Sequence, residues 1–157
     1  LLAERHPDAL HGLVDVDGNL SPGDCVYSGR AVRHDLEDFL AHGFARLLES
    51  VARRGRRDAA QRGYHRSMEL CDPRLFHLHS RELVELSAAE DLARRLAGLP
   101  LPTLYVAGVP GGACARSLEL LAEAGAERVE IGPSGHWPFL DQPARFVETL
   151  VSFLERL

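Results

Sequence analysis

Apolar residues follow two different periods along this chain, and the two periods separate its middle from its ends. In the middle, between residues 27 and 98, apolar positions recur every three to four residues, which is typical of amphipathic helices. Toward both ends, short apolar runs rich in β-branched residues predict buried strands. The strands are expected at residues 13–17, 103–107 and 128–131.

Helices are expected to alternate with these strands. Residues 1–10 have the pattern of the last turns of a helix, which ends at His6-Pro7 because proline disfavours a helical residue before it. A second helix is expected from 113 to 124, ending at Gly125, and a third from 142 to 157. Alternating helices and strands predict an α/β fold with an open, mostly parallel sheet.

The long helical stretch interrupts this alternation and is therefore interpreted as an insertion. We expect residues 1–20 and 100–157 to form the α/β core, and residues 21–99 to form a helical cap or lid. The strand at 13–17 would have an unpaired parallel edge, and such edges promote association. A missing amino-terminal half or a partner chain is expected to cover it.

Composition excludes several classes of function. The chain has 157 residues and a net charge of −5, so it offers no basic field for nucleic acid or an anionic membrane. Its three cysteines are odd in number and widely spaced, unlike a disulfide or metal framework, which favours a reducing compartment. No membrane span and no signal peptide is visible, so a cytoplasmic location is expected. We expect neither a metal nor a cofactor.

One histidine stands in an unusual segment near the end of the chain. The segment reads Gly-Pro-Ser-Gly-His-Trp-Pro-Phe-Leu-Asp-Gln-Pro over residues 132–143, with His136 on a glycine turn between a predicted strand and the last helix. A histidine held this way is rigid and still reachable, as a general base must be. A surface-loop role for this histidine is the alternative.

The segment resembles the catalytic-histidine loop of the α/β-hydrolase superfamily. The resemblance implies that the three predicted strands are the sixth to eighth of that fold, and that the insertion lies at the cap position. It also implies a nucleophile on a Gly-x-Ser-x-Gly elbow, which does not occur in these 157 residues and is expected upstream of Leu1. The chain therefore resembles the carboxyl-terminal half of an esterase-like hydrolase for a small apolar ester, inactive as an isolated fragment.

The acid that would orient His136 is assigned less directly. Many members of the superfamily have an aspartate after the seventh strand, where residues 108–112 read Gly-Val-Pro-Gly-Gly and contain no carboxylate. Some subgroups place the acid at the end of the sixth strand, which here is Asp17, at the carboxyl edge where catalytic groups of open α/β sheets collect. Asp24 and Asp15 are the reserves, and a capping or turn role for Asp17 is the alternative.

Other chemical signals favour simpler explanations. Ser134 lacks the glycine spacing of an elbow, and the Gly111-Gly112 segment before Cys114 lacks the lysine of a phosphate loop. The arginines at 53–57 are expected on a solvated face. His77-x-His79 lacks a third ligand for zinc. Four aromatic residues of the insertion could line a pocket or form its core: Phe39, Phe44, Tyr64 and Phe76.

Two functions of other classes stay open. The chain could be a non-catalytic remnant or interaction module of the same fold. A nucleotide-binding doubly wound domain is the third hypothesis, which would need the phosphate-loop chemistry that the Gly111-Gly112 segment lacks.

Overall fold

The computed structural model describes residues 2–157, which form two compact units. The sheet unit contains Leu1–Asp24 and Ala89–Leu157, and the helical unit contains Cys25–Ala88. The helical unit is shorter than the insertion expected at 21–99. Helix α7 (Leu92–Ala97) contributes Ala93 and Leu96 to the core of the sheet unit. The spacing of apolar residues in α7 predicts a helix but does not indicate which unit the helix packs against.

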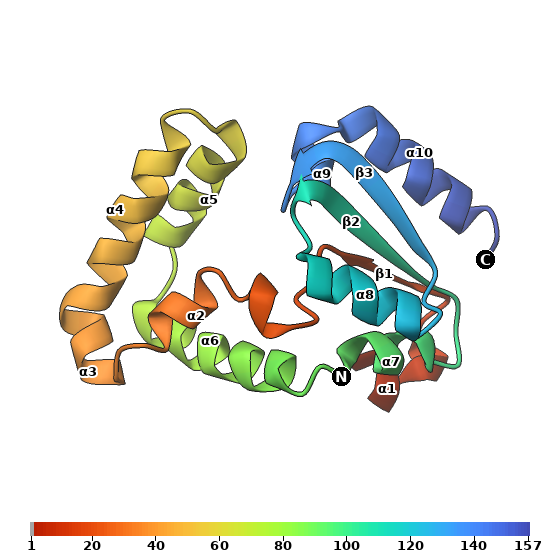
Figure 1. Ribbon diagram of the computed structural model, residues 1–157, viewed down its shortest axis with the longest axis horizontal. Coiled ribbons are helices and arrows are strands. Elements are labelled where there is room, and N and C mark those ends of the chain that lie inside the picture. The colour runs from red at the N-terminus through yellow and green to blue at the C-terminus, as the bar shows by residue number, and fades with distance from the viewer. Residues whose placement is uncertain (1) are drawn as a thin grey trace. The chain divides into compact units, whose positions relative to one another are not determined.

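The sheet has three parallel strands in the order β1-β2-β3, as expected for an α/β fold (Figure 1). They are β1 (Leu13–Val16), β2 (Thr103–Gly111) and β3 (Arg128–Gly135). Strand β1 pairs with β2 in the register Val14 to Leu104, and β2 pairs with β3 in the register Val106 to Val129. Within the described residues, β1 therefore has a strand neighbour on one side only.

Helices cover both faces of the sheet, because alternate side chains of β2 point to opposite faces. Tyr105 and Ala107 pack in a core with residues of α7 and of α8 (Ala115–Glu123). Leu104 and Val106 pack with Phe153 of α10 (Pro143–Leu154) on the other face. Figure 1 shows α8 and α10 on opposite sides of the strands. A strand buried on both faces reads as a continuous apolar run, which is why β2 was predictable.

The carboxyl-terminal part of the sheet unit departs from the expected boundaries. Strand β3 continues four residues beyond the expected end at 131, because Pro110 and Gly111 of β2 pair with Ser134 and Gly135. A one-turn helix, α9 (Pro138–Asp141), then precedes α10. His136 thus follows the last residue of β3 directly. At the other end, α1 (Leu2–Arg5) ends before Pro7, and a 3-10 turn follows at Pro7–Ala9.

The helical unit contains helices and turns only, over residues 25–88, all of which the structure describes. Its elements are α2 (Ser28–Ala31), α3 (Leu36–Asp38), a π-helical turn (Phe39–Gly43), α4 (Phe44–Gly55), α5 (Ala59–Glu69) and α6 (Pro73–Ala88). Three aspartates cap helices by accepting a backbone N–H three residues ahead: Asp35 at α3, Asp58 at α5 and Asp72 at α6.

Aromatic rings fill the core of the helical unit. Phe39 stacks on Phe76 at 6.2 Å between ring centroids, and Phe44 meets both rings edge-on. Tyr64 packs against the same cluster. All four aromatic residues of the sequence prediction thus contribute to packing, which stabilises the unit through buried ring area, and Phe39 also lines a cavity of about 200 Å³.

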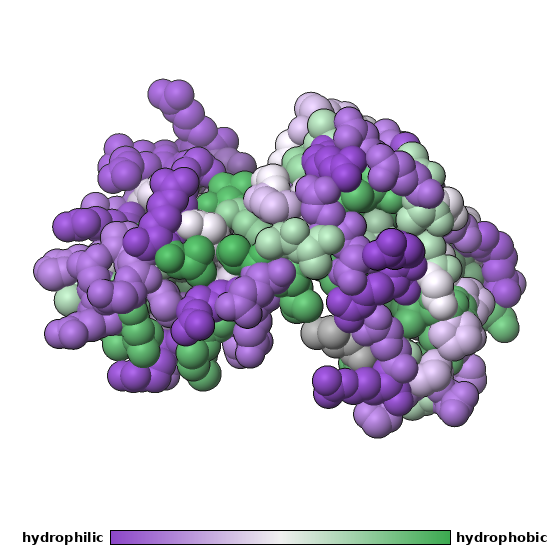
Figure 2. Space-filling model, turned by 60° about the horizontal axis from the view of Figure 1, so that its bottom comes forward, coloured by the Kyte–Doolittle hydropathy of each residue, from purple (hydrophilic) through white to green (hydrophobic). Residues whose placement is uncertain are grey.

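Hydrophilic side chains cover much of both units in the view of Figure 2, with apolar patches between them. Across residues 2–157, no helix is both long enough and apolar enough to span a membrane.

Candidate functional site

The candidate site lies at the carboxyl edge of the sheet, where β1 ends at Val16 and β3 ends at Gly135. Asp17 follows the first of these strands and His136 follows the other. Side chains that follow parallel strands of one sheet gather at the same edge, here on either side of the middle strand β2. The two residues meet there although 119 positions separate them in sequence.

His136 and Asp17 form a direct hydrogen bond. The imidazole Nδ1 lies 2.7 Å from Oδ2 of Asp17. A carboxylate only accepts hydrogen bonds, so Nδ1 of His136 donates and carries the proton. In a neutral ring, Nε2 then has the free lone pair. The His136 side chain is 48% exposed, so this nitrogen belongs to a ring that solvent can reach.

Asp17 is almost completely buried, with 2% of its surface exposed, and its carboxylate is well satisfied. Its Oδ1 accepts the backbone N–H of Gly108 at 2.8 Å and that of Ala113 at 2.9 Å. Together with His136, three donors compensate the cost of removing this carboxylate from water. The end of β2 and the turn after it therefore hold the acid through their backbone, although residues 108–113 contain no carboxylate.

Two backbone features bring the Asp17 carboxylate into this position. Asp17 has a φ of 52°, in the left-handed region that aspartate tolerates better than most residues. Gly112 lies so close that an added Cβ would stand 2.5 Å from Oδ2 and 2.6 Å from Oδ1 of Asp17. Only glycine leaves room for the carboxylate at this point of the loop.

The reserve acids have other surroundings. Asp15 is half-buried on β1, and burial raises the pKa of its carboxyl group, with a further raising effect from the Asp17 charge and a lowering one from the Gly18 backbone. The bond of the His136 ring goes to Asp17 and not to Asp15. Burial also raises the pKa of Tyr105, whose hydroxyl donates to the Gly18 carbonyl at 2.7 Å. Asp15 and Tyr105 thus lie beside the site without bonding the histidine.

Asp24 organises a turn. Its Oδ1 accepts the N–H of Cys114 at 2.8 Å, and its Oδ2 accepts the N–H of Leu20 at 2.9 Å and the hydroxyl of Ser117 at 2.5 Å. Ser21 bonds Ser117 at 2.8 Å. These contacts fasten the turn before the helical unit to the start of α8. The carboxylate of Asp24 is occupied by them and does not reach His136.

Two other sequence candidates in the sheet unit have structural contacts. The Ser134 hydroxyl lies 3.0 Å from the Gly135 carbonyl and 3.1 Å from a carboxylate oxygen of Asp141. Cys114 precedes the first residue of α8, with its thiol 3.2 Å from Oγ of Ser21. Among the residues the structure describes, no group of three or more His, Cys, Asp or Glu side chains could hold a metal ion.

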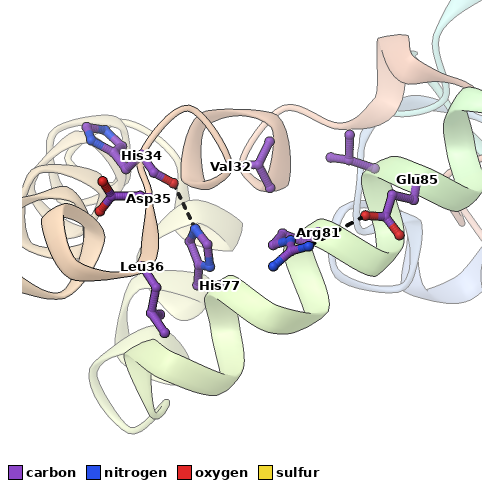
Figure 3. A pocket seen from close by; sticks show the side chains of 8 residues that line it. Val32, His34, Asp35, Leu36, His77, Arg81 and Glu85 are labelled. Carbon is purple, nitrogen blue, oxygen red and sulfur yellow. Dashed lines mark hydrogen bonds and ion pairs between the residues drawn. The ribbon is translucent and has the colours of Figure 1, made fainter.

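A cavity of about 440 Å³ in the helical unit is the clearest alternative site (Figure 3). Its walls come from α6 and from the segment around His34. His77 is 4% exposed, and its Nε2 donates to the His34 carbonyl at 2.9 Å, while its Nδ1 is buried with no partner among the described residues. Arg81 and Glu85 form a loose ion pair at 4.0 Å beside it. No acid orients this histidine.

Some residues of the candidate site carried no signal in the sequence. The amides of Gly108 and Ala113 act through the backbone, so their side chains reveal nothing about Asp17. The Gly111-Gly112 pair was the available signal, since two glycines beside a strand end indicate a close approach. Asp141 was also overlooked, although it stands in the histidine segment.

The fold is similar to that of a solved structure, the enol-lactonase from Burkholderia xenovorans LB400. The TM-score is 0.67 and the sequence identity 24%, over 98% of this chain. The chain spans 60% of the length of that protein. No protein-family model matches the chain, and no curated protein matches its sequence. The similarity establishes the fold alone: an α/β arrangement of a three-stranded parallel sheet with flanking helices, which matches the structure of that α/β-hydrolase.

Proposed function

We propose that this chain supplies the histidine and the acid of a nucleophile–histidine–acid triad in an α/β-fold hydrolase. His136 is the general base, and Asp17 orients it. The observation that carries the proposal is the 2.7 Å hydrogen bond from Nδ1 of His136 to a carboxylate that two backbone amides hold in place. This bond selects the tautomer whose Nε2 can accept a proton.

The proposed chemistry is the hydrolysis of a small, largely apolar ester or related electrophile. Nε2 of His136 removes the proton of a serine or cysteine nucleophile, or of the attacking water when an aspartate is the nucleophile. Asp17 stabilises the imidazolium that forms, without being protonated itself. The reaction needs no cofactor, and the helical unit stands in the chain order where the superfamily has its cap insertion.

The nucleophile and the oxyanion-hole donors come from polypeptide additional to these residues, because the 157 residues contain no Gly-x-Ser-x-Gly elbow. The free side of β1 is where a further parallel strand of that polypeptide would pair. By itself the chain is then expected to have no esterase activity and to associate through this edge.

The test combines the complete coding sequence with an esterase assay. An in-frame elbow with Ser, Asp or Cys upstream of Leu1, and hydrolysis of p-nitrophenyl butyrate that His136→Ala abolishes, support the proposal. An enol lactone is the second substrate, because the similar structure is an enol-lactonase. If no such elbow precedes the chain, or if the His136→Ala protein keeps its rate, the chain is a non-catalytic module of the fold.

A further inference from the structure

Three side chains form hydrogen bonds with backbone groups among the four residues before His136. Asp141, Gln142 and Arg145 lie at the end of α9 and the beginning of α10. Gln142 Nε2 donates to the carbonyl of Pro133 at 2.9 Å, and a guanidinium nitrogen of Arg145 donates to the carbonyl of Gly132 at 2.8 Å. Three side chains, from α9, from α10 and from the residue between them, thus bond four consecutive residues of β3.

Asp141 makes the contact that lies nearest the histidine. Its Oδ2 accepts the backbone N–H of Gly135 at 2.8 Å and lies 3.1 Å from the Ser134 hydroxyl. The carboxylate reaches this amide because α9 is a single turn, closed by the bond from the Asp141 N–H to the Trp137 carbonyl. The chain therefore loops from Gly135 through His136 and returns to Gly135.

The Gly135 amide belongs to the peptide that joins Ser134 to Gly135, so fixing it fixes the direction in which the chain enters His136. Gly135 has no side chain of its own to pack, and its φ and ψ angles are therefore less restricted than those of other residues. The bond to Asp141 restricts the orientation of this peptide, at the strand end where Gly135 also pairs with Gly111 of β2. The imidazole must be aimed at Asp17 to within a fraction of an ångström for the bond between them to persist.

We infer that Asp141 is a positioning residue for His136, acting through the Gly135 amide to keep the imidazole aligned with Asp17. This inference rests on the proposed function, because alignment matters for turnover only if His136 is the base. The Asp141 side chain needs only an acceptor oxygen for this task, since both groups that face it are donors.

The first measurement follows the imidazole itself in the 157-residue chain. Proton–nitrogen NMR of ¹⁵N-labelled protein, with His136 assigned through His136→Gln, reports the Nδ1–H that donates to Asp17. Asp141→Ala is expected to broaden this resonance and to shift it toward that of an unbonded ring. Asp141→Asn keeps an acceptor oxygen and is expected to restore the wild-type resonance. Glu148→Ala, which removes another exposed acid from α10, is the matched control and should change nothing.

The second measurement is turnover by the complete protein with its nucleophile. Asp141→Ala is expected to lower kcat by about 10- to 100-fold with KM within about threefold of wild type, because a misplaced base slows chemistry rather than binding. Asp141→Asn should recover most of kcat. Asp141→Glu displaces the carboxylate by one methylene and should therefore also shift the His136 Nδ1–H resonance. It tests the positioning role if Asp141→Ala does not fold.

The two measurements separate the two proposals. An unchanged His136 resonance in Asp141→Ala and in Asp141→Glu overturns the positioning role, whatever the activity. A shifted resonance in a protein whose hydrolysis does not depend on His136 overturns the proposed function and leaves the positioning of the ring intact. Loss of kcat in Asp141→Ala that Asp141→Asn does not recover also contradicts the inference, since it would require the charge.

Discussion

In each unit, one ring nitrogen of a histidine bonds a residue far away in the sequence, His136 to Asp17 in the sheet unit and His77 to His34 in the helical unit, and the two bonds differ in ways that bear on reactivity. In the sheet unit, His136 is about half exposed and its Nδ1 donates to the buried carboxylate of Asp17. In the helical unit, His77 is 4% exposed and its Nε2 donates to a backbone carbonyl. The outer nitrogen of His136 belongs to a reachable ring, whereas the second nitrogen of His77 is enclosed by protein.

The partner of each histidine matters as much as its exposure. A carboxylate stabilises the imidazolium that forms when the ring accepts a proton, whereas a neutral carbonyl does so far less. His77 also packs against Phe39 at 5.1 Å between ring centroids, so it joins the aromatic core of its unit. We therefore propose a chemical role for His136 and a packing role for His77, and each of the following substitutions tests one side of this proposal.

The largest effect is expected from Asp17→Asn in the complete protein. The amide has the shape of the carboxylate, but its NH₂ group can donate to Nδ1 of His136 and so favours the tautomer with a proton on Nε2. We expect kcat for p-nitrophenyl butyrate to fall by about 10⁴-fold, the loss seen when a triad histidine is held in the wrong tautomer. A fall of less than about tenfold would show that Asp17 does not orient the base.

A smaller effect is expected from Gly112→Ala, which places a methyl group against both oxygens of Asp17. Overpacking of this kind costs about 1–3 kcal/mol of unfolding free energy, and it should also displace the carboxylate from His136. Gly63→Ala is the matched control, because nothing lies within 4 Å of an added Cβ there and the residue is inside α5. The control should stabilise the chain by about 0.5–1 kcal/mol, as measured by urea unfolding. Equal changes in unfolding free energy at the two glycines would contradict the close approach of Gly112 to the Asp17 carboxylate.

His77→Ala should lower the stability of the chain without changing the ring of His136. The substitution leaves the His34 carbonyl without its donor and opens a gap beside Phe39, at a cost of about 1–3 kcal/mol. His79→Ala, an exposed position on the same helix, is the control and should change the unfolding free energy by less than about 0.5 kcal/mol. A loss of the His136 Nδ1–H resonance in His77→Ala would contradict the proposal that His77 stabilises its own unit without affecting His136.

The smallest expected effect is a change in how the stability of the chain depends on pH, caused by Asp15. Burial raises the pKa of Asp15, so the folded state binds this proton more tightly than the unfolded state does. Its contribution to stability is therefore fully present below the unfolded pKa, about 3.9, and is lost as pH rises through the raised folded pKa. Asp15→Asn should match wild type at pH 3 and be more stable at pH 7. Urea unfolding at the two pH values measures this, and a variant less stable at pH 7 would contradict the sign.

The sequence predicted the parts of the fold that have a local pattern. Strands β1 and β2 are short apolar runs, the glycine turn marks His136, and the fold class followed from the alternation of elements. The boundary at Ala88 carried no signal, because the apolar period of α7 is the same whether its partner is a sheet or a helix. The additional length of β3 depends on pairing with Pro110 and Gly111, which a single segment does not reveal.

The site was predictable to a different degree. Asp17 was predicted to be the partner of His136 from its place at a strand end and from the resemblance to hydrolase subgroups with an acid there; the structure has this bond, and its catalytic role stays a prediction. The amides that hold its carboxylate lie more than 90 positions away, and any residue except proline provides an N–H. Backbone donors therefore leave no mark in composition, and Asp141 stood among residues that read equally well as the start of a helix.

A double-mutant cycle on the complete protein tests the central claim most directly. It compares kcat/KM for p-nitrophenyl butyrate in wild type, Asp17→Asn, His136→Ala and the double variant, with folding of each checked by circular dichroism. Because Asp17 acts only through His136, the double variant should be as slow as His136→Ala alone. Losses that multiply in the double variant, or a His136→Ala protein that keeps its wild-type rate, would contradict the account.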